Sequence, residues 1–77
     1  MPHRIGLVAA FSKPEATVLA QEISAWLTER GWEIVPEARL SQNAAHEVSA
    51  IIVLGGDGLM MRAANAYPDT PLLGINF

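Results

Sequence analysis

The sequence contains no cysteine, few aromatic residues, no cluster of basic residues and no long hydrophobic run. Without cysteine, neither a disulfide framework nor a thiolate metal site is possible. The net charge of −3 argues against nucleic-acid binding through phosphate neutralisation, so we expect no nucleic-acid partner. The apolar stretch IGLVAAF is only about seven residues long, which favours a short buried strand over the core of a signal peptide. We therefore expect a cytoplasmic protein with no membrane partner.

Composition limits the size and completeness of the domain. A chain of 77 residues is enough for one small domain. Hydrophobic residues make up 51% of it and charged residues only 17%. We expect part of this apolar surface to contact something outside the chain, which also stops at Phe77 within an apolar segment, as if cut from a longer protein. The histidines His3 and His46 have no partners at metal-ligand spacing, so we predict no metal-ligating residues.

Apolar segments alternate with segments of helical periodicity. We expect strands at 4–10, 32–35, 50–54 and 72–77, one helix between Ser12 and Gly31, and another over 58–67. Continuous apolar strands that alternate with helices are typical of a parallel sheet covered on both faces. The sequence therefore predicts an α/β fold over residues 1–77, with a Rossmann-like parallel sheet and flanking helices.

Several residues have predicted local roles in this fold. Ser12 is a candidate N-cap of the first helix, Gly31 is placed to end that helix, and Trp26 lies on its apolar stripe and is expected in the core. The apolar face expected for the second helix consists of Met60, Ala63, Ala64 and Tyr67. Residues 37–49 are less regular, and one side of a short helix there would be formed by Leu40, Ala44, Ala45 and Val48.

The loop Gly55-Gly56-Asp57-Gly58 follows the third expected strand and precedes a helix, where open parallel sheets bind ligands. It matches neither G-x-G-x-x-G nor the P-loop pattern. Asp57 has two interpretations. It is either the N-cap of the second helix, or a carboxylate that accepts a hydrogen bond from a sugar hydroxyl and takes its proton during phosphoryl transfer.

The segment LGGDGLMMRAANAYPDTPLLGIN resembles the NAD kinases, which have a Gly-Gly-Asp-Gly loop, a helix and then a Pro-x-Leu-Gly-x-Asn segment. Diacylglycerol and sphingosine kinases and phosphofructokinases share the first motif, whereas PLLGIN favours the NAD kinases. The resemblance is dense over residues 50–77 and looser over RIGLVA and KPEA. It implies that this chain is the amino-terminal part of a two-domain kinase whose β-rich carboxyl-terminal domain is missing here.

The resemblance also implies site residues. Asp57 matches the proposed acceptor of the proton from the 2′-hydroxyl of the adenosine ribose of NAD, and Asp57 and Gly58 match the nucleotide-binding pair. Arg62 matches a further NAD contact, although on residue pattern alone it would be a solvated surface arginine. Leu59 stands where the family usually has threonine, which puts the contacts to phosphate or metal in doubt.

The implied reaction is phosphorylation of NAD to NADP, with ATP or polyphosphate as donor and a divalent metal ion such as Mg²⁺. The partners are then small-molecule nucleotides, and the full-length enzyme is expected to be a homo-oligomer. We expect residues 1–77 alone to be inactive, because phosphoryl transfer needs both substrates held in line. Two alternatives stay open: a lipid kinase of the diacylglycerol type, and a non-catalytic α/β nucleotide-binding module in which Asp57 is only a cap.

Overall fold

The computed structural model describes residues 3–10, 12–40 and 47–77. In chain order, the elements are β1 (His3–Ala9), α1 (Pro14–Glu29), β2 (Trp32–Pro36), α2 (Glu37–Arg39), β3 (Ala50–Gly55), α3 (Asp57–Ala66) and β4 (Leu72–Asn76). Of the short helix considered for 37–49, Ala44 and Ala45 lie outside the described residues. No helix in the described ranges has the length and apolar character needed to cross a membrane.

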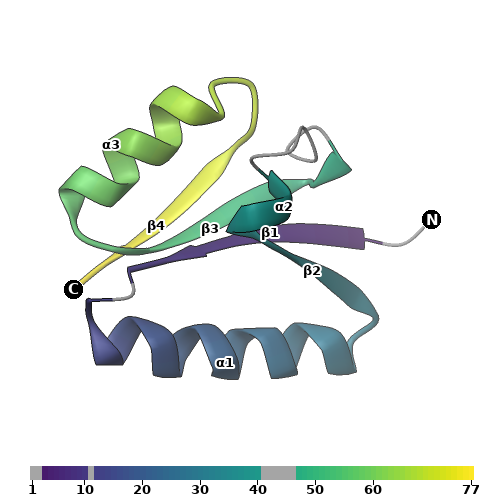
Figure 1. The fold of residues 1–77 in the computed structure, drawn as a ribbon. Coiled ribbons are helices and arrows are strands. Elements are labelled where there is room, and N and C mark those ends of the chain that lie inside the picture. The colour runs from purple at the N-terminus through teal and green to yellow at the C-terminus, as the bar shows by residue number, and fades with distance from the viewer. Residues whose placement is uncertain (1–2, 11, 41–46) are drawn as a thin grey trace.

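The strands form one sheet of order β2-β1-β3-β4, and every neighbouring pair is parallel. Helix α1 lies on one face of the sheet, and α2 and α3 lie on the other (Figure 1). The helices change faces because the connections β1–β2 and β3–β4 run in opposite directions along the sheet and parallel crossovers are right-handed. The predicted α/β parallel fold is confirmed.

The order of the strands places a crevice between β1 and β3. After β1 the chain continues to β2, at one end of the strand order, and after β3 it continues to β4, at the other end. In open α/β sheets, ligands bind at such a switch point, beyond the carboxyl ends of the strands. Here that edge carries Ala10, Ser12 and Lys13, between β1 and α1, and Gly56, between β3 and α3.

The main core lies between the sheet and the face that carries α2 and α3. Its buried members are Val8, Val35, Leu40, Val48, Ile51, Val53 and Ala63, with Leu59, Met60, Tyr67 and Leu72 packed against them. Alternation along the strands turns Ile5 and Leu54 to the other face, toward α1, where Ala16 is also buried. Ala64 is exposed, so its prediction as part of the apolar face of α3 is wrong, and Leu59 takes its place.

Two predictions for α1 are wrong. Its N-cap is Lys13, not Ser12, and no side chain caps the helix. Lys13 has an extended backbone because it precedes Pro14, and this moves the boundary one residue along the chain. Trp26 is 54% exposed rather than in the core, and the guanidinium of Arg30, one turn later, lies 3.7 Å from its ring centroid.

The end of α1 follows the prediction. Gly31 has φ 84°, which is the left-handed conformation that glycine adopts without strain, and its N–H donates to the carbonyl of Thr28 at 3.1 Å. The helix therefore stops at the start of β2. This also keeps Arg30 and Trp26 at the amino-terminal edge of the sheet, away from the crevice.

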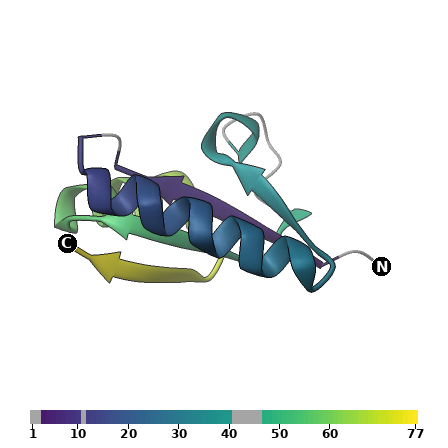
Figure 2. The ribbon, with the colours of Figure 1, turned by 90° about the horizontal axis from the view of Figure 1, so that it is seen from below.

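Strand β4 is covered on one face only. Helix α1 crosses beneath β1 and β3 and leaves β4 to one side (Figure 2). The side chains of β4 that alternate onto this uncovered face, Leu73 and Ile75, are 59% and 36% exposed, whereas Phe77, just after the strand, borders a hollow with α1. The uncovered apolar face agrees with the high apolar content of the chain, because a parallel sheet is normally covered on both sides.

We predict that Gly6→Ala lowers the free energy of unfolding of the chain by about 1–3 kcal/mol, the usual cost of overpacking. A Cβ at Gly6 would lie 2.9 Å from side-chain atoms of Ile51 and Leu40, and both of these residues are buried. Urea unfolding followed by circular dichroism measures the change. The matched control is Gly58→Ala, where a Cβ meets nothing within 4 Å and stability should be unchanged or slightly higher. Equal effects of the two substitutions would contradict this packing.

Candidate functional site

The loop between β3 and α3 presents Asp57 without using it as a helix cap. Gly56 is the N-cap residue, with φ −97° and ψ −176°, and Asp57 is the first residue of α3. No side chain caps this helix, so the interpretation of Asp57 as an N-cap is wrong. The negative charge still lies in the first turn, where the helix dipole favours it.

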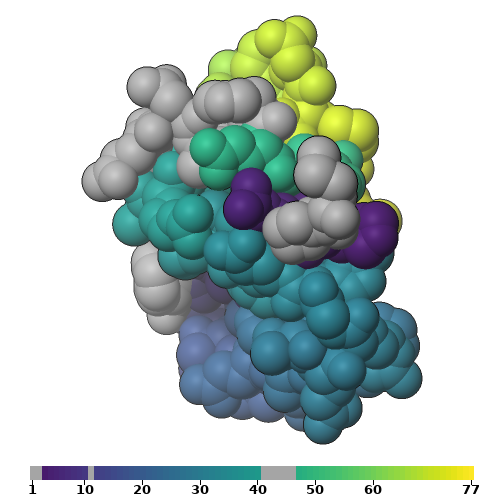
Figure 3. Space-filling view, turned by 90° about the vertical axis from the view of Figure 1, so that its right-hand side faces the viewer, coloured from purple at the N-terminus to yellow at the C-terminus, as the bar shows by residue number. Residues whose placement is uncertain are grey.

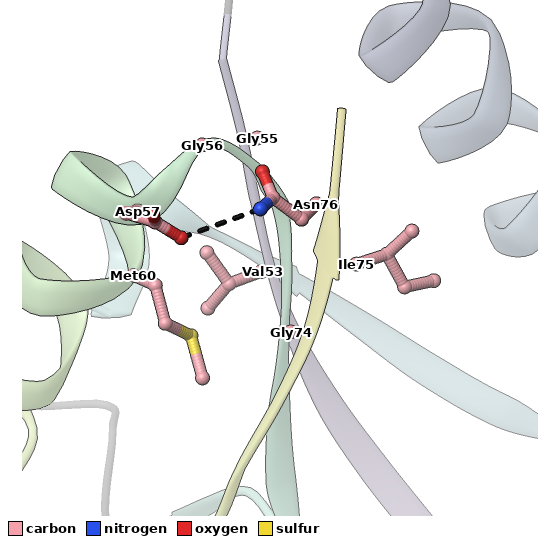
Figure 4. A pocket seen from close by; sticks show the side chains of 8 residues that line it. All are labelled: Val53, Gly55, Gly56, Asp57, Met60, Gly74, Ile75 and Asn76. Atoms are coloured by element: carbon pink, nitrogen blue, oxygen red, sulfur yellow. Dashed lines mark hydrogen bonds between the residues drawn. The ribbon is translucent and has the colours of Figure 1, made fainter.

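The carboxylate of Asp57 instead faces the end of the neighbouring strand. Asn76, the last residue of β4, donates a hydrogen bond from Nδ2 to Oδ1 of Asp57 at 3.3 Å. Both side chains border a hollow of about 220 Å³, and Figure 4 shows them pointing toward each other across its mouth while Ile75 points away. Sequence reasoning did not assign a role to Asn76, although it is the last residue of the PLLGIN segment.

Gly55 allows two loops to approach each other closely at this edge. A Cβ at Gly55 would lie 2.8 Å from Cδ2 of Leu59 and 3.1 Å from Cβ of Ala10. Any larger residue would therefore push the loop after β1 away from the loop after β3. Gly56 and Gly58 have open space instead, because a Cβ at either position meets nothing within 4 Å. The outer surface of the loop can thus be approached closely by a ligand.

A second hollow, of about 320 Å³, lies at the switch point on the other side of this loop. Its lining consists of Ala9, Ala10, Ser12, Gly58, Leu59 and Arg62. The structure therefore brings two of the predicted site residues, Gly58 and Arg62, to one hollow and places the third, Asp57, at the other. Gly56 and Asp57 line the first hollow and Gly58 lines the second, so a ligand lying across the start of α3 would contact both.

Arg62 is exposed, and it is paired with α2 rather than with the loop. Its Nη2 lies 3.3 Å and 3.4 Å from the two carboxylate oxygens of Glu37, and 66% of its side chain is exposed. Glu37 was not expected to act near the site, because this part of the chain is irregular in sequence. An exposed ion pair of this kind contributes little to stability, so the guanidinium can leave it for a ligand at low cost.

The pKa of Tyr67 is raised above its ordinary value of 10.0, chiefly because burial disfavours the phenolate. The negative charge of Glu37 raises it further, and the positive charge of Arg62 opposes this. Tyr67 belongs to the apolar side of α3, where it packs against the core. It therefore reports on the ion pair between α2 and α3.

Charges at the opposite edge of the sheet pair with one another. Figure 3 shows the start of β1 between the starts of β2 and β3. There Arg4 Nε lies 2.7 Å from Oε2 of Glu33, Arg4 Nη1 lies 3.8 Å from Glu47, and Arg39 lies 3.4 Å from Glu33. The hydrogen bond from Arg4 lowers the pKa of Glu33, and Glu33 raises the pKa of Arg4. In contrast, the hydrogen bond that Asp57 accepts comes from the neutral side-chain amide of Asn76.

The described part of the chain contains no group of three or more histidine, cysteine, aspartate or glutamate residues that could hold a metal ion. His3 instead stacks against Trp32, with ring centroids 4.7 Å apart. His46 lies outside the described residues.

The sequence is similar to curated NAD kinases over nearly its whole length. It is 50% identical over 76 residues to the NAD kinase of Thermomicrobium roseum, which is 99% of this chain and 26% of that protein. The NAD kinases of Nitratidesulfovibrio vulgaris and Syntrophotalea carbinolica are 43% and 36% identical over 84 and 87 residues, covering 96% and 95% of this chain. The chain belongs to the NAD kinase family.

The chain spans about a quarter to a third of the length of these relatives: 26%, 28% and 30%. No family model matches it. Most of the length of each of these relatives therefore has no counterpart in the 77 residues of this chain.

Titration of Tyr67 tests the placement of Glu37 and Arg62. Because Tyr67 is the chain's sole tyrosine, ultraviolet difference absorbance follows its ionisation directly. We predict a pKa above 10.0, a lower value in Glu37→Gln and a higher value in Arg62→Ala. Glu22→Gln, which alters an exposed residue of α1 on the other face of the sheet, should leave the pKa of Tyr67 unchanged.

The same titration has a stability consequence. The folded state holds the Tyr67 proton more tightly than the unfolded state does. Proton binding by Tyr67 therefore stabilises the fold fully below pH 10, and this stabilisation is lost as the pH rises through the raised pKa of Tyr67. If neither Glu37→Gln nor Arg62→Ala moved the pKa of Tyr67, the ion pair would lie elsewhere in solution.

Proposed function

We propose that residues 1–77 form the amino-terminal α/β nucleotide-binding domain of an NAD kinase. This enzyme would transfer a phosphoryl group from ATP, or from polyphosphate, to the 2′-hydroxyl of the adenosine ribose of NAD, giving NADP. The observation that carries the proposal is the position of the Asp57 carboxylate: it lines the hollow of about 220 Å³ at the carboxyl edge of the sheet and has no role as a helix cap. The names of the relatives support NAD as the acceptor over a lipid hydroxyl.

In the proposed reaction, Asp57 accepts a hydrogen bond from the 2′-hydroxyl and orients its oxygen toward the γ-phosphorus of ATP. The new O–P bond forms as the bond from phosphorus to the β–γ bridging oxygen breaks and ADP leaves. The hydroxyl proton moves to the Asp57 carboxylate. A carboxylate suffices because a loose transition state requires mainly positioning, with proton transfer late.

The other predicted site residues would bind the nucleotide. Gly58 leaves its backbone open at the start of α3, where N–H groups attract anionic groups. Arg62 borders the same hollow and would exchange Glu37 for an anionic part of NAD. Leu59 offers no hydroxyl to a phosphate, so we assign no phosphate contact to its side chain.

A divalent cation such as Mg²⁺ would arrive with the donor rather than in a site preformed by this chain. The described residues form no group of ligands suited to a metal ion, and Asp57 is the single carboxylate that lines either hollow. Magnesium is commonly held by one or two carboxylates and substrate phosphates. The donor phosphates would supply most of its ligands, and we assign no step to it.

We also propose that these residues need the rest of an NAD kinase for activity. A β-rich carboxyl-terminal domain would form the opposite wall of the nucleotide site, and the enzyme would be a cytoplasmic homo-oligomer. Two features support this: the chain covers 26–30% of its relatives, and the apolar face of β4 is uncovered. Among the described residues, one carboxylate and one arginine line the two hollows, too few groups to align two substrates.

The central test is Asp57→Asn in the full-length protein. We predict that kcat for NADP formation with ATP and magnesium falls by roughly 10²–10⁴-fold, the usual contribution of a general base. Folding should be unchanged, because the asparagine is isosteric and Asp57 caps nothing. Asp69→Asn, in the exposed turn before β4, is the matched control and should keep full activity. A folded Asp57→Asn enzyme with a normal rate would leave the non-catalytic module as the better interpretation.

Arg62→Ala should raise the KM for NAD by roughly tenfold while kcat changes little. The reason is that the contact is made to a bound part of the substrate, and one charge-assisted hydrogen bond contributes about 1.5–3 kcal/mol. Steady-state kinetics with NAD varied at saturating ATP measures both constants. Arg30→Ala, at the far end of α1, is the control and should leave the KM unchanged. An unchanged KM in Arg62→Ala would show that Arg62 serves only its ion pair with Glu37.

A further inference from the structure

We propose that Asn76 is a positioning residue for the reaction: its side-chain amide holds one oxygen of the Asp57 carboxylate and leaves the other oxygen free for the 2′-hydroxyl. The proposal rests on the proposed function, in which Asp57 is the general base. Asn76 itself does not touch the reacting atoms. It acts by restricting the rotation of the side chain that does.

The chemistry of the two groups determines the direction of their hydrogen bond. An ionised carboxylate only accepts hydrogen bonds, so the amide of Asn76 must turn its Nδ2 toward Asp57. The distance of 3.3 Å from Nδ2 to Oδ1 is at the long end for a bond of this kind. Such a bond would orient the carboxylate through Oδ1 and leave the second oxygen, Oδ2, free to accept a hydrogen bond from the substrate.

The sheet determines where Asn76 lies. Gly55 and Asn76 are directly paired in the parallel ladder of β3 and β4, and the N–H of Phe77 donates to the carbonyl of Gly55 at 3.0 Å. Asn76 is therefore held opposite Gly55, which lies two residues before Asp57, the first residue of α3. Because residues alternate along a strand, Asn76 shares its face with Gly74 and Leu72, toward α3.

Helix α3 packs on β4 at Gly74. A Cβ at Gly74 would lie 3.0 Å from Cε and Sδ of Met60, so the thioether of Met60 packs directly over the backbone of β4. Met60 is one turn after Asp57 on α3. A Cβ at position 74 would make the end of the Met60 side chain move by a few tenths of an ångström, so glycine at this position permits the close packing of α3 on β4.

A held carboxylate should matter for rate more than for substrate binding. A general base must be within hydrogen-bond reach of the proton it accepts, and small misplacements of reacting groups are costly. NAD would be held by contacts to other parts of the nucleotide, and loss of Asn76 would leave those contacts intact. The expected signature is a lower rate of the chemical step at an unchanged KM for NAD.

Two substitutions in the full-length protein separate hydrogen bonding from packing. Asn76→Ala removes the amide, and the single-turnover rate of NADP formation should fall by roughly tenfold, less than in Asp57→Asn. Asn76→Asp keeps the shape of the side chain but places a second carboxylate beside Asp57, where like charges repel. Its rate should be at least as low as that of Asn76→Ala. Asn65→Ala, at an exposed position of α3, is the control and should keep the normal rate.

Each outcome of this experiment decides the proposal. If Asn76→Asp kept a normal rate while Asn76→Ala lost it, Asn76 would act by filling space. If both variants raised the KM for NAD as much as they lowered the rate, Asn76 would bind the substrate directly. A normal rate in Asn76→Ala would show that Asp57 needs no such support. These results leave the proposed function standing, because that fails only if a folded Asp57→Asn enzyme remains active.

Discussion

The arrangement of the site depends on the parallel pairing of β3 with β4. Because both strands run the same way, their carboxyl ends meet at one edge, and the register places Asn76 opposite Gly55. The loop after Gly55 then delivers Asp57 next to the amide of Asn76, at 3.3 Å. A shift of this register by one residue would turn Asn76 to the uncovered face of β4 and break the contact.

Most of the fold could be predicted because apolar strands and amphipathic helices have distinct periods, and Gly31 marks the end of α1 as expected. The errors have local causes that periodicity does not show. Lys13 replaces Ser12 as the N-cap because a residue before proline is extended. Trp26 is on the correct stripe of α1, but it is exposed, with Arg30 stacked on its ring. Periodicity locates a face of a helix without showing how much of it the sheet covers.

The candidate site was only partly predictable from the sequence. The glycine-rich loop drew attention to Asp57, because a carboxylate between glycines has a structural or chemical reason. Asn76 and Glu37 were missed because their relevance comes from contacts across 19 and 25 residues of sequence. Asn76 could have been found by one further step: the carboxyl ends of neighbouring parallel strands lie at the same edge of a sheet. No comparable signal in the sequence points to Glu37, which precedes residues of irregular pattern.

In the proposed reaction Asp57 takes the proton of the ribose 2′-hydroxyl, and a crystal structure of the full-length protein with NAD bound tests this role most directly. We predict one carboxylate oxygen of Asp57 within about 2.6–3.2 Å of the 2′-oxygen of the adenosine ribose. The other oxygen should still accept the hydrogen bond from Asn76. A bound NAD whose 2′-hydroxyl faces a different base, with Asp57 out of hydrogen-bonding reach, would contradict the account.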